Sequence, residues 1–445
     1  MRFSLHGLRT PITTFLLALI VGLSGSFFPR LNRAGEAASA SANAIQHDLY
    51  VFVDGTIYVY DTDNGYALVK TISLPETSVG GRGIAASPTT GTLFLSYGGD
   101  GTIHGNGSLL AYNLVTDKVM WTANYNHGVD SISVTPDGKT LYVPGGAADT
   151  ANLWYVIDAS NGNQITTINA GGGAHNTVMS LDGKYVYLGG LYWNNLIQVS
   201  TSTNQVTQTI GPLVNDVRPF TVNGTDTLAF TTETDNLGFE VSSIQTGQVL
   251  YTVPIAGFTC CSSSWPAAAN APSHGISISP DERELYVIDA PNSYVHVFDI
   301  SGLPNNAPVQ VADIPLNTPM GGNESPCAYD CTQEGWLMHS LDGRYVYVGD
   351  SGDVIDTQTR QIVTNLPELA QTRQFIEIDW ANGSPVNASQ RESIGQITGT
   401  TTPTVTPTVI RTPTPAATPT PSATPTPADQ GADLPGRIYL PRIMS

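Results

Sequence analysis

The chain has 445 residues, of which 40% are hydrophobic and 12% charged, and its formal net charge is −19 at pH 7. This length is enough for two ordinary domains or for one large all-β domain with a sizeable core. A surface this acidic repels phosphate backbones, which excludes nucleic acid as an expected partner.

An apolar run near the N-terminus predicts export. Arg2 and Arg9 precede the run at residues 12–28, and a stretch of small residues follows it at 37–44. Basic residues, an apolar core and a small-x-small motif are typical of a signal peptide, which we expect over residues 1–40. The run is long for a signal core, so an uncleaved membrane anchor is the alternative. In both cases we expect the remainder of the chain to be secreted or held at the cell surface.

Short segments rich in Val, Ile and Tyr, separated by Gly, Asp and Asn turns, fill the chain from residue 47 onward, and two patterns alternate along it. The first is a strand with Tyr or Phe near its middle, and its seven copies lie at 47–53, 91–97, 139–145, 184–190, 227–233, 283–289 and 344–350. The second is an apolar pair followed by a turn-capping residue, which in the seven copies is Asp61, Asn113, Asp158, Ser200, Ser242, Asp299 or Asp356.

A further strand is predicted before six of the seven copies of the first pattern. Aligned on the turn, these strands start at intervals of 43 to 61 residues, at Arg82, Asp130, His175, Arg218, His274 and Gly335. The first copy lacks such a strand, and the segment that starts at Arg373 can supply it. Seven units of four strands predict an all-β, seven-bladed β-propeller over residues 47–380, with the ring closed by pairing of the N-terminal strands with a C-terminal strand.

The turns of the clearest copies carry a family resemblance. The segments DGKTLYVPGG, DGKYVYLGG, DERELYVID and DGRYVYVGD resemble the repeats of YVTN-type (YncE-like) propellers of exported bacterial proteins. The resemblance covers residues 47–380 and implies the fold, but such propellers serve many unrelated functions. It also implies that the first strand of each blade lines the central channel and starts near one face.

The aligned strand starts are therefore expected to surround one mouth of the channel. Six of the seven are polar or charged, and we expect these six to bind a ligand there: Arg82, Asp130, His175, Arg218, His274 and Arg373. The alternative is that they satisfy one another and channel water. His127 lies three residues before Asp130 and His339 lies four after Gly335, so both could approach the same mouth.

The four Cys are confined to the two longest connections between repeats, residues 258–273 and 317–334, and they are Cys260, Cys261, Cys327 and Cys331. Outside the cytoplasm we expect disulfides. Four Cys allow three connectivities, and adjacent Cys pair poorly, so pairing between the two loops, over His274, is favoured. A thiolate or His–Cys site for copper or zinc is the alternative.

Composition changes after residue 380. Residues 381–432 are polar and then rich in Thr and Pro, which predicts a disordered linker or stalk. Residues 433–445 form a more apolar tail, either a sorting or anchoring tag or a frayed end.

No fingerprint of serine hydrolysis, zinc proteolysis or dinucleotide binding occurs in the sequence. We therefore expect no cofactor and no metal, and favour a non-catalytic, monomeric binding or interaction module for a small molecule, a glycan or a protein. Association with the cell surface would run through either terminus. The alternative is an enzyme, lactonase-like, lyase-like or a metal-dependent oxidoreductase, that uses the His and Arg residues at the same mouth.

Overall fold

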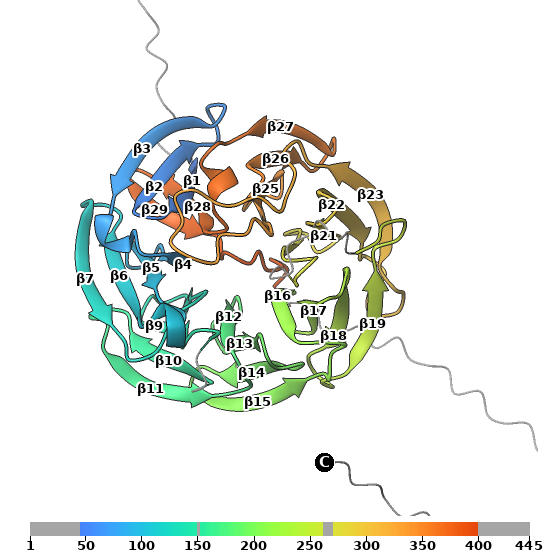
Figure 1. Cartoon of the computed structure of the whole chain (residues 1–445), viewed down its shortest axis with the longest axis horizontal. Coiled ribbons are helices and arrows are strands. Elements are labelled where there is room, and N and C mark those ends of the chain that lie inside the picture. Colours follow the sequence, from blue (N-terminus) through green and yellow to red (C-terminus); the bar gives the residue numbers. More distant parts are fainter. Residues whose placement is uncertain (1–44, 149–151, 261–269, 399–445) are drawn as a thin grey trace, which may run out of the picture. The chain divides into compact units, whose positions relative to one another are not determined.

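The structure, a computed structural model, describes residues 45–148, 152–260 and 270–398. These residues form a seven-bladed β-propeller in which seven antiparallel sheets surround a central channel (Figure 1). The predicted leader and Thr/Pro-rich stalk lie outside the described residues, as does the C-terminal tail. No helix within the described ranges is long and apolar enough to cross a membrane.

Six blades have four strands each, ordered from the channel outward. Three of them are β4–β7 (Gly81–Ser87, Thr92–Gly98, Gly107–Asn113, Lys118–Asn124), β8–β11 (Ser133–Val134, Thr140–Pro144, Leu153–Asp158, Gln164–Asn169) and β12–β15 (Ala174–Met179, Tyr185–Gly190, Leu196–Ser200, Gln205–Ile210). The other three are β16–β19 (Val217–Val222, Leu228–Glu233, Gly238–Ser243, Val249–Pro254), β20–β23 (Ile276–Ile278, Glu284–Asp289, Tyr294–Asp299, Val309–Pro315) and β24–β27 (Trp336–His339, Tyr345–Gly349, Asp353–Asp356, Gln361–Asn365).

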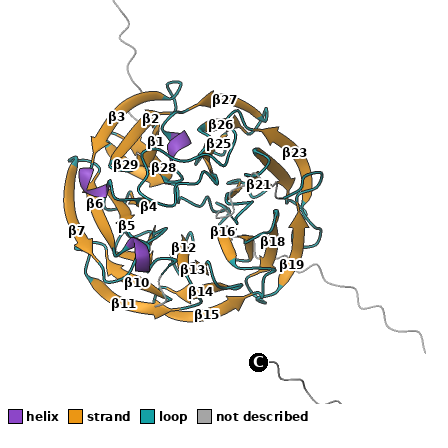
Figure 2. Ribbon diagram, viewed as in Figure 1, coloured by secondary structure: helices purple, strands orange, loops and turns teal. Residues whose placement is uncertain are grey.

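The seventh blade joins the two ends of the repeat region. Its order is β29-β28-β1-β2-β3, with β1 (Gln46–Val53), β2 (Thr56–Asp61), β3 (Ala67–Ser73), β28 (Phe375–Ala381) and β29 (Ser384–Ala388). β1 pairs antiparallel with β28, so the predicted closure of the ring is confirmed. The helical elements of the described residues are three short 3₁₀ turns (Figure 2), at Pro75–Thr77, Thr102–His104 and Leu369–Gln371.

The repeated aromatic residue explains why the blades pack together. It lies on the second strand of six blades and on β1 of the closing blade, and it is at most 2% exposed at each position, namely Tyr50, Phe94, Tyr142, Tyr187, Phe230, Tyr286 and Tyr347. Tyr142, for example, belongs to the same apolar cluster as Met179 and Val186 of the next blade. Each such side chain removes a large apolar area from water between two sheets. The pattern is therefore the packing unit of the ring.

The turn-capping prediction holds for the Asx residues. The side chain of each accepts backbone hydrogen bonds from residues two or three positions downstream, at Asp61, Asn113, Asp158, Asp299 and Asp356. Ser200 and Ser242 form no such bond to the backbone, and in the second of these turns Ser243 accepts the bond from Thr246 instead. The Asx carboxyl or amide oxygen reaches the backbone amides of the turn directly. The serine side chain is shorter, and a neighbouring serine can accept the hydrogen bond in its place.

The prediction of a disordered linker from residue 381 is wrong for residues 381–398. Strand β29 lies on the channel side of β28, and the chain then crosses the channel as residues 389–398, here called the channel segment (Figure 1). Gln390 exchanges hydrogen bonds of 3.0 and 2.7 Å with the backbone of Met179, and the Gly395 amide donates to the Val222 carbonyl. A polar composition does not prevent order here, because the first strands of three blades satisfy the polar groups of the segment.

Candidate functional site at the channel mouth

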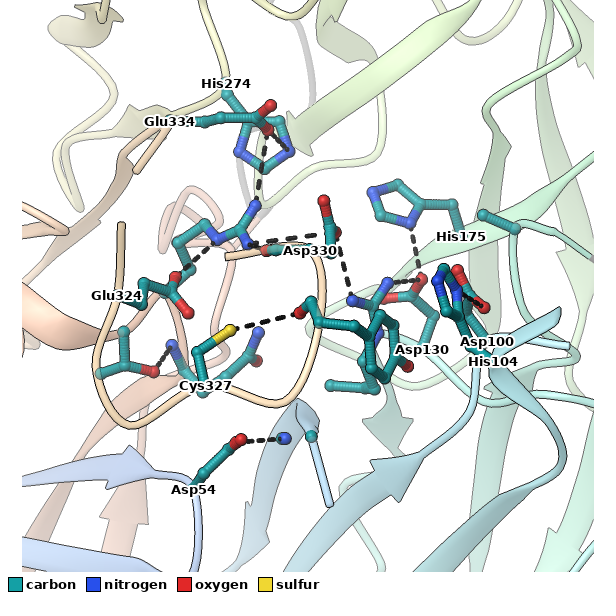
Figure 3. Close-up of a pocket in the computed structure, with 18 of the residues that line it drawn as sticks. Asp54, Asp100, His104, Asp130, His175, His274, Glu324, Cys327, Asp330 and Glu334 are labelled. Carbon is teal, nitrogen blue, oxygen red and sulfur yellow. Dashed lines mark hydrogen bonds and ion pairs between the residues drawn. The ribbon is translucent and has the colours of Figure 1, made fainter. Parts of the chain in front are cut away.

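A cavity of about 400 Å³ opens at the end of the channel where the first strands begin. All six residues predicted for the ligand site line it, from six different blades: Arg82, Asp130, His175, Arg218, His274 and Arg373. The side chains labelled in Figure 3 converge on this space. The seventh aligned position, Gly335, contributes its backbone instead, since its carbonyl accepts a 3.1 Å hydrogen bond from His274 Nδ1.

One side of the cavity is a chain of three ring residues. Arg82 Nη2 donates to Asp130 Oδ2 at 2.9 Å, and His175 Nδ1 donates to the same oxygen at 2.8 Å. Burial alone would raise the pKa of Asp130, but the Arg82 guanidinium and His175 outweigh burial and lower this pKa to about 2. The ionised Asp130 therefore fixes the His175 ring with Nδ1 protonated. His175 Nε2 is buried and has no hydrogen-bond partner among the described residues.

The opposite side is built around Arg373. Its Nε lies 3.1 Å from Glu324 Oε1, its Nη1 3.4 Å from Glu334 Oε2, and its Nη2 donates to the Asp330 carbonyl at 2.8 Å. Burial raises the pKa of Glu324 well above its usual range and that of Glu334 to about 7, while Arg373 acts in the other direction. Glu334 therefore titrates near neutral pH within the cavity.

His274 faces Glu334 across 3.5 Å, measured from Nε2 to Oε2. The His274 ring is 4% exposed, and burial together with the nearby Arg373 holds its pKa well below the usual range. A neutral imidazole that donates from Nδ1 to a carbonyl leaves Nε2 as an acceptor for a protonated Glu334. His274 is thus a polar wall of the cavity and carries no charge at pH 7.

Arg218 differs from the other two ring arginines in its partners. Its Nε donates to Thr234 Oγ1 at 2.9 Å and its Nη2 donates to the side-chain oxygen of Asn270, both neutral groups. No carboxylate in the described ranges forms an ion pair with it, whereas Arg82 and Arg373 each contact at least two. Burial lowers the pKa of Arg218, which nevertheless remains a cation at neutral pH.

The loop at residues 317–334, here called the mouth loop, supplies residues that sequence reasoning missed. Asp330 Oδ2 lies 3.3 Å from Arg82 Nη1 and 4.0 Å from Arg373 Nη2. The Tyr329 hydroxyl donates to the Gly98 carbonyl at 2.5 Å, and the Ala328 amide donates to Asp54 Oδ2 at 3.0 Å. The mouth loop therefore reaches the blade of β4–β7, on the far side of the cavity from His274. The acidic residues of the loop were the available sequence signal, because carboxylates are the expected ion-pair partners of the ring arginines.

The expected disulfides between the two Cys-bearing loops are not formed. Cys327 pairs with Cys331 inside the mouth loop, with a Cα–Cα distance of 5.8 Å that suits a disulfide. The reason is local, because an antiparallel bridge between Asn323 and Thr332 brings the two sides of the loop together. Cys260 is not a free thiol, and Cys261 lies outside the described residues. The disulfide also removes these two sulfurs as thiolate ligands for the metal site considered as the alternative.

The remaining histidines lie in different environments. His339 is 2% exposed, bonded to Ser277, and does not line the mouth, and His127 is likewise absent from the cavity lining. His296 is fully buried inside its strand between Asp289 and Asp313. His104 is exposed on its loop, where it lines the cavity and stacks on Tyr329 at 4.2 Å.

Comparisons with known proteins assign no family to this chain. No family model matches the chain, and no curated protein matches it. Among solved structures, the chain is similar to hydrazine synthase of Kuenenia stuttgartiensis, with a TM-score of 0.39 and 17% sequence identity over 63% of this chain and 96% of that chain. No function is inferred from this likeness.

Proposed function

We propose that this protein is an exported, non-catalytic binding module that holds a small polar ligand, bearing one anionic group, at the channel mouth. The observation that carries the proposal is Arg218, a half-buried cation that lines the cavity and forms no ion pair with a carboxylate of the described residues, although Glu334, Asp330 and Asp216 lie near enough to raise its pKa. Taking an ion out of water costs free energy unless an opposite charge compensates for it. An anionic group of the ligand would supply that charge.

The other cavity groups define the remainder of the ligand. His175 Nε2 has no hydrogen-bond partner among the described residues, and Asp330, whose side chain is 49% exposed, offers a carboxylate oxygen. Both favour hydroxyl or amino groups on the ligand. A space of about 400 Å³ fits a molecule of monosaccharide or disaccharide size. The class that combines these features is a hydroxy or amino acid, such as a sugar acid.

An enzyme at the same mouth is the second candidate, and the Asp130–His175 pair favours it. A carboxylate that bonds Nδ1 and leaves Nε2 facing a cavity is the arrangement of a general base. Such an enzyme would be lactonase-like or lyase-like, with Arg218 holding the anionic part of the substrate. It predicts turnover of a lactone panel that His175→Ala abolishes, while the binding module predicts no turnover.

The test of the binding proposal is a ligand-observed NMR screen of acidic and neutral fragments of cavity size against the full chain. We expect acidic fragments, such as glucuronate, to bind preferentially over neutral counterparts, such as glucose. Arg218→Ala should lose these hits, whereas Arg283→Ala, which removes an exposed arginine elsewhere, should keep them. Equal binding of acidic and neutral fragments, or hits indifferent to Arg218→Ala, would contradict the proposal.

We also propose that the chain belongs with the YVTN-type (YncE-like) exported propellers and acts outside the cytoplasm. The repeated turns at 137–145, 182–190, 281–289 and 342–350 support the family, and the apolar run at 12–28 supports export. The Cys327–Cys331 disulfide fits an oxidising compartment. Fractionation of cells that express the full chain, with protease accessibility of the propeller, tests the location.

A further inference from the structure

A second cluster of ionisable residues lies where the ring closes, at the opposite end of the closing blade from the mouth. His47 belongs to β1, and Glu377 and Asp379 belong to β28, in which Asp379 is the register partner of His47. Asp379 follows Arg373 by six residues, a distance of about 20 Å along an extended strand. The cluster is therefore separate from the site proposed above.

The three side chains present donor atoms at distances that suit a metal ion. His47 Nδ1 lies 2.6 Å from Asp379 Oδ1 and 3.6 Å from Glu377 Oε1, and the three donor atoms all lie within 4.8 Å of one another. Ligand atoms about 2.1 Å from a Zn²⁺ or similar ion are separated by roughly 3.0–3.6 Å. Small rotations of the side chains would bring the three atoms to that spacing.

Glu377 has an oxygen that the protein itself does not use. Its side chain is 2% exposed, and Oε2 accepts from the Leu341 amide and the Tyr347 hydroxyl, both at 3.3 Å. Oε1 accepts no hydrogen bond from the described residues and is directed at His47. A carboxylate oxygen that accepts no hydrogen bond is available as a metal ligand. A cavity of about 300 Å³ lies beside His47 and Glu377, and the hydroxyl of Tyr66, which lines it, is buried without a hydrogen-bond partner among the described residues.

The charges around the cluster favour a cation. Asp63 and Asp342 line the same cavity, together with Glu377. The cation among the lining residues is Arg344, whose side chain is 64% exposed, stacks on the ring of Tyr345 and makes its ion pair with Asp356. No arginine or lysine of the described residues therefore neutralises Glu377 and Asp379.

We infer that His47, Glu377 and Asp379 form a binding site for one divalent transition-metal ion of the Zn²⁺ or Mn²⁺ class. One imidazole and two carboxylates form a donor set that suits these ions and leaves coordination positions for water or a neighbouring oxygen. Because the ligands come from strands more than 300 residues apart in sequence, the ion would clamp β1 to β28. Binding to the folded state alone stabilises that state. This inference departs from the absence of metal expected from the sequence.

The experiment uses the full chain without a polyhistidine tag, stripped of metal with EDTA and titrated with Zn²⁺ or Mn²⁺. We expect one ion per chain and a melting temperature that rises with ion concentration. Glu377→Gln retains the shape of the side chain and an acceptor for Tyr347, and it should weaken binding by roughly 100-fold and abolish the rise. Asp63→Asn, which alters an exposed carboxylate at the rim, should keep both.

Two results would overturn the inference: no stoichiometric binding of either ion to the wild-type chain, or binding and melting-temperature shifts unchanged in Glu377→Gln. Folding of each variant is checked by circular dichroism. A manganese-soaked crystal of the wild-type chain is independent of the variants. It should give an anomalous difference peak bounded by His47, Glu377 and Asp379, and a peak only at other carboxylates would contradict the site.

Discussion

At the scale of single residues, the channel mouth is a set of charges removed from water and held by a few short contacts. Asp130 receives both Arg82 and His175 on one oxygen, so its negative charge is compensated inside the fold. Arg218 has only neutral hydrogen-bond partners among the described residues. Asp130 therefore helps to maintain the cavity, whereas Arg218 is available to a ligand.

Asp130→Asn should destabilise the protein at neutral pH. The folded-state pKa of Asp130, about 2, lies below the ordinary value of 3.8, so its stabilising contribution is present above pH 4 and is lost as pH falls toward 2. The size follows from the shift and is on the order of 2 kcal/mol. Urea unfolding at pH 7 and pH 3 measures it. Asp137→Asn, at a side chain 54% exposed, is the control and should change little. Equal stability of the two variants at pH 7 would contradict the assignment.

At the scale of elements, two segments outside the repeats complete the propeller. The channel segment places Arg391 in the interior, where its Nη1 donates to Ser131 Oγ at 2.8 Å and its guanidinium lies 3.4 Å from the centre of the Trp336 ring. The mouth loop lies over the other end of the channel and supplies Asp330 to Arg82 and Arg373. One segment therefore supports the channel wall and the other shapes the cavity.

Arg391→Ala should cost about 3–5 kcal/mol of unfolding free energy, because it removes the cation that faces the buried Glu392 carboxylate and the donor to Ser131 Oγ. Burial lowers the pKa of Arg391 to about 10, so the side chain is charged at pH 7. Thermal and chemical unfolding measure the loss. Arg283→Ala, at an exposed arginine, should remain within about 0.5 kcal/mol of wild type. An Arg391→Ala variant with the same unfolding free energy as wild type would mean that the channel segment contributes little to the fold.

Opening the Cys327–Cys331 disulfide should affect the ligand site more than the fold. The paired Cys→Ser variant frees the mouth loop, which presents Asp330 to the cavity, while the blades retain their own contacts. Affinity for an acidic ligand such as glucuronate should fall roughly 10-fold through the cost of ordering the loop. Calorimetric titration and melting temperature separate the two effects. A large loss of melting temperature with unchanged affinity would contradict this role.

The elements differ in how far local sequence determines them. The seven aromatic strands and the ring positions from Arg82 to Arg373 could be predicted, because each repeat carries its own hydrophobic pattern and turn. The channel segment could not, since its polar residues are ordered only by partners such as Met179 and Val222 in distant strands. The path of the mouth loop depends likewise on Asp54 and Gly98, which no local pattern connects to residues 328 and 329.

At the scale of the whole molecule, several buried carboxyl groups set the dependence of stability on pH. Burial raises the pKa of Glu233, which is fully buried, to about 8 and that of Glu334 to about 7. A raised carboxyl pKa gives a contribution that is complete below the unfolded value of 4.5 and is lost as pH rises through the folded value. The protein should therefore be more stable at pH 5 than at pH 8.

Glu233→Gln tests this dependence directly. The substitution keeps a neutral side chain of the same shape next to Thr231 and Asn236 and removes the cost of ionisation. The decline in unfolding free energy between pH 5 and pH 8 should shrink by on the order of 3–5 kcal/mol. Melting curves across this range provide the measurement. A decline as steep in Glu233→Gln as in wild type would show that this group does not control it.

The account depends most on the channel mouth being a binding site for an anionic group. The direct measurement is a crystal structure of the full chain with the tightest acidic fragment from the NMR screen. We predict that the fragment occupies the cavity between Arg218 and His175, with its anionic group within hydrogen-bonding distance of the Arg218 guanidinium and a hydroxyl or amino group facing His175 Nε2. A fragment bound elsewhere, or with its anionic group directed away from Arg218, would contradict the account.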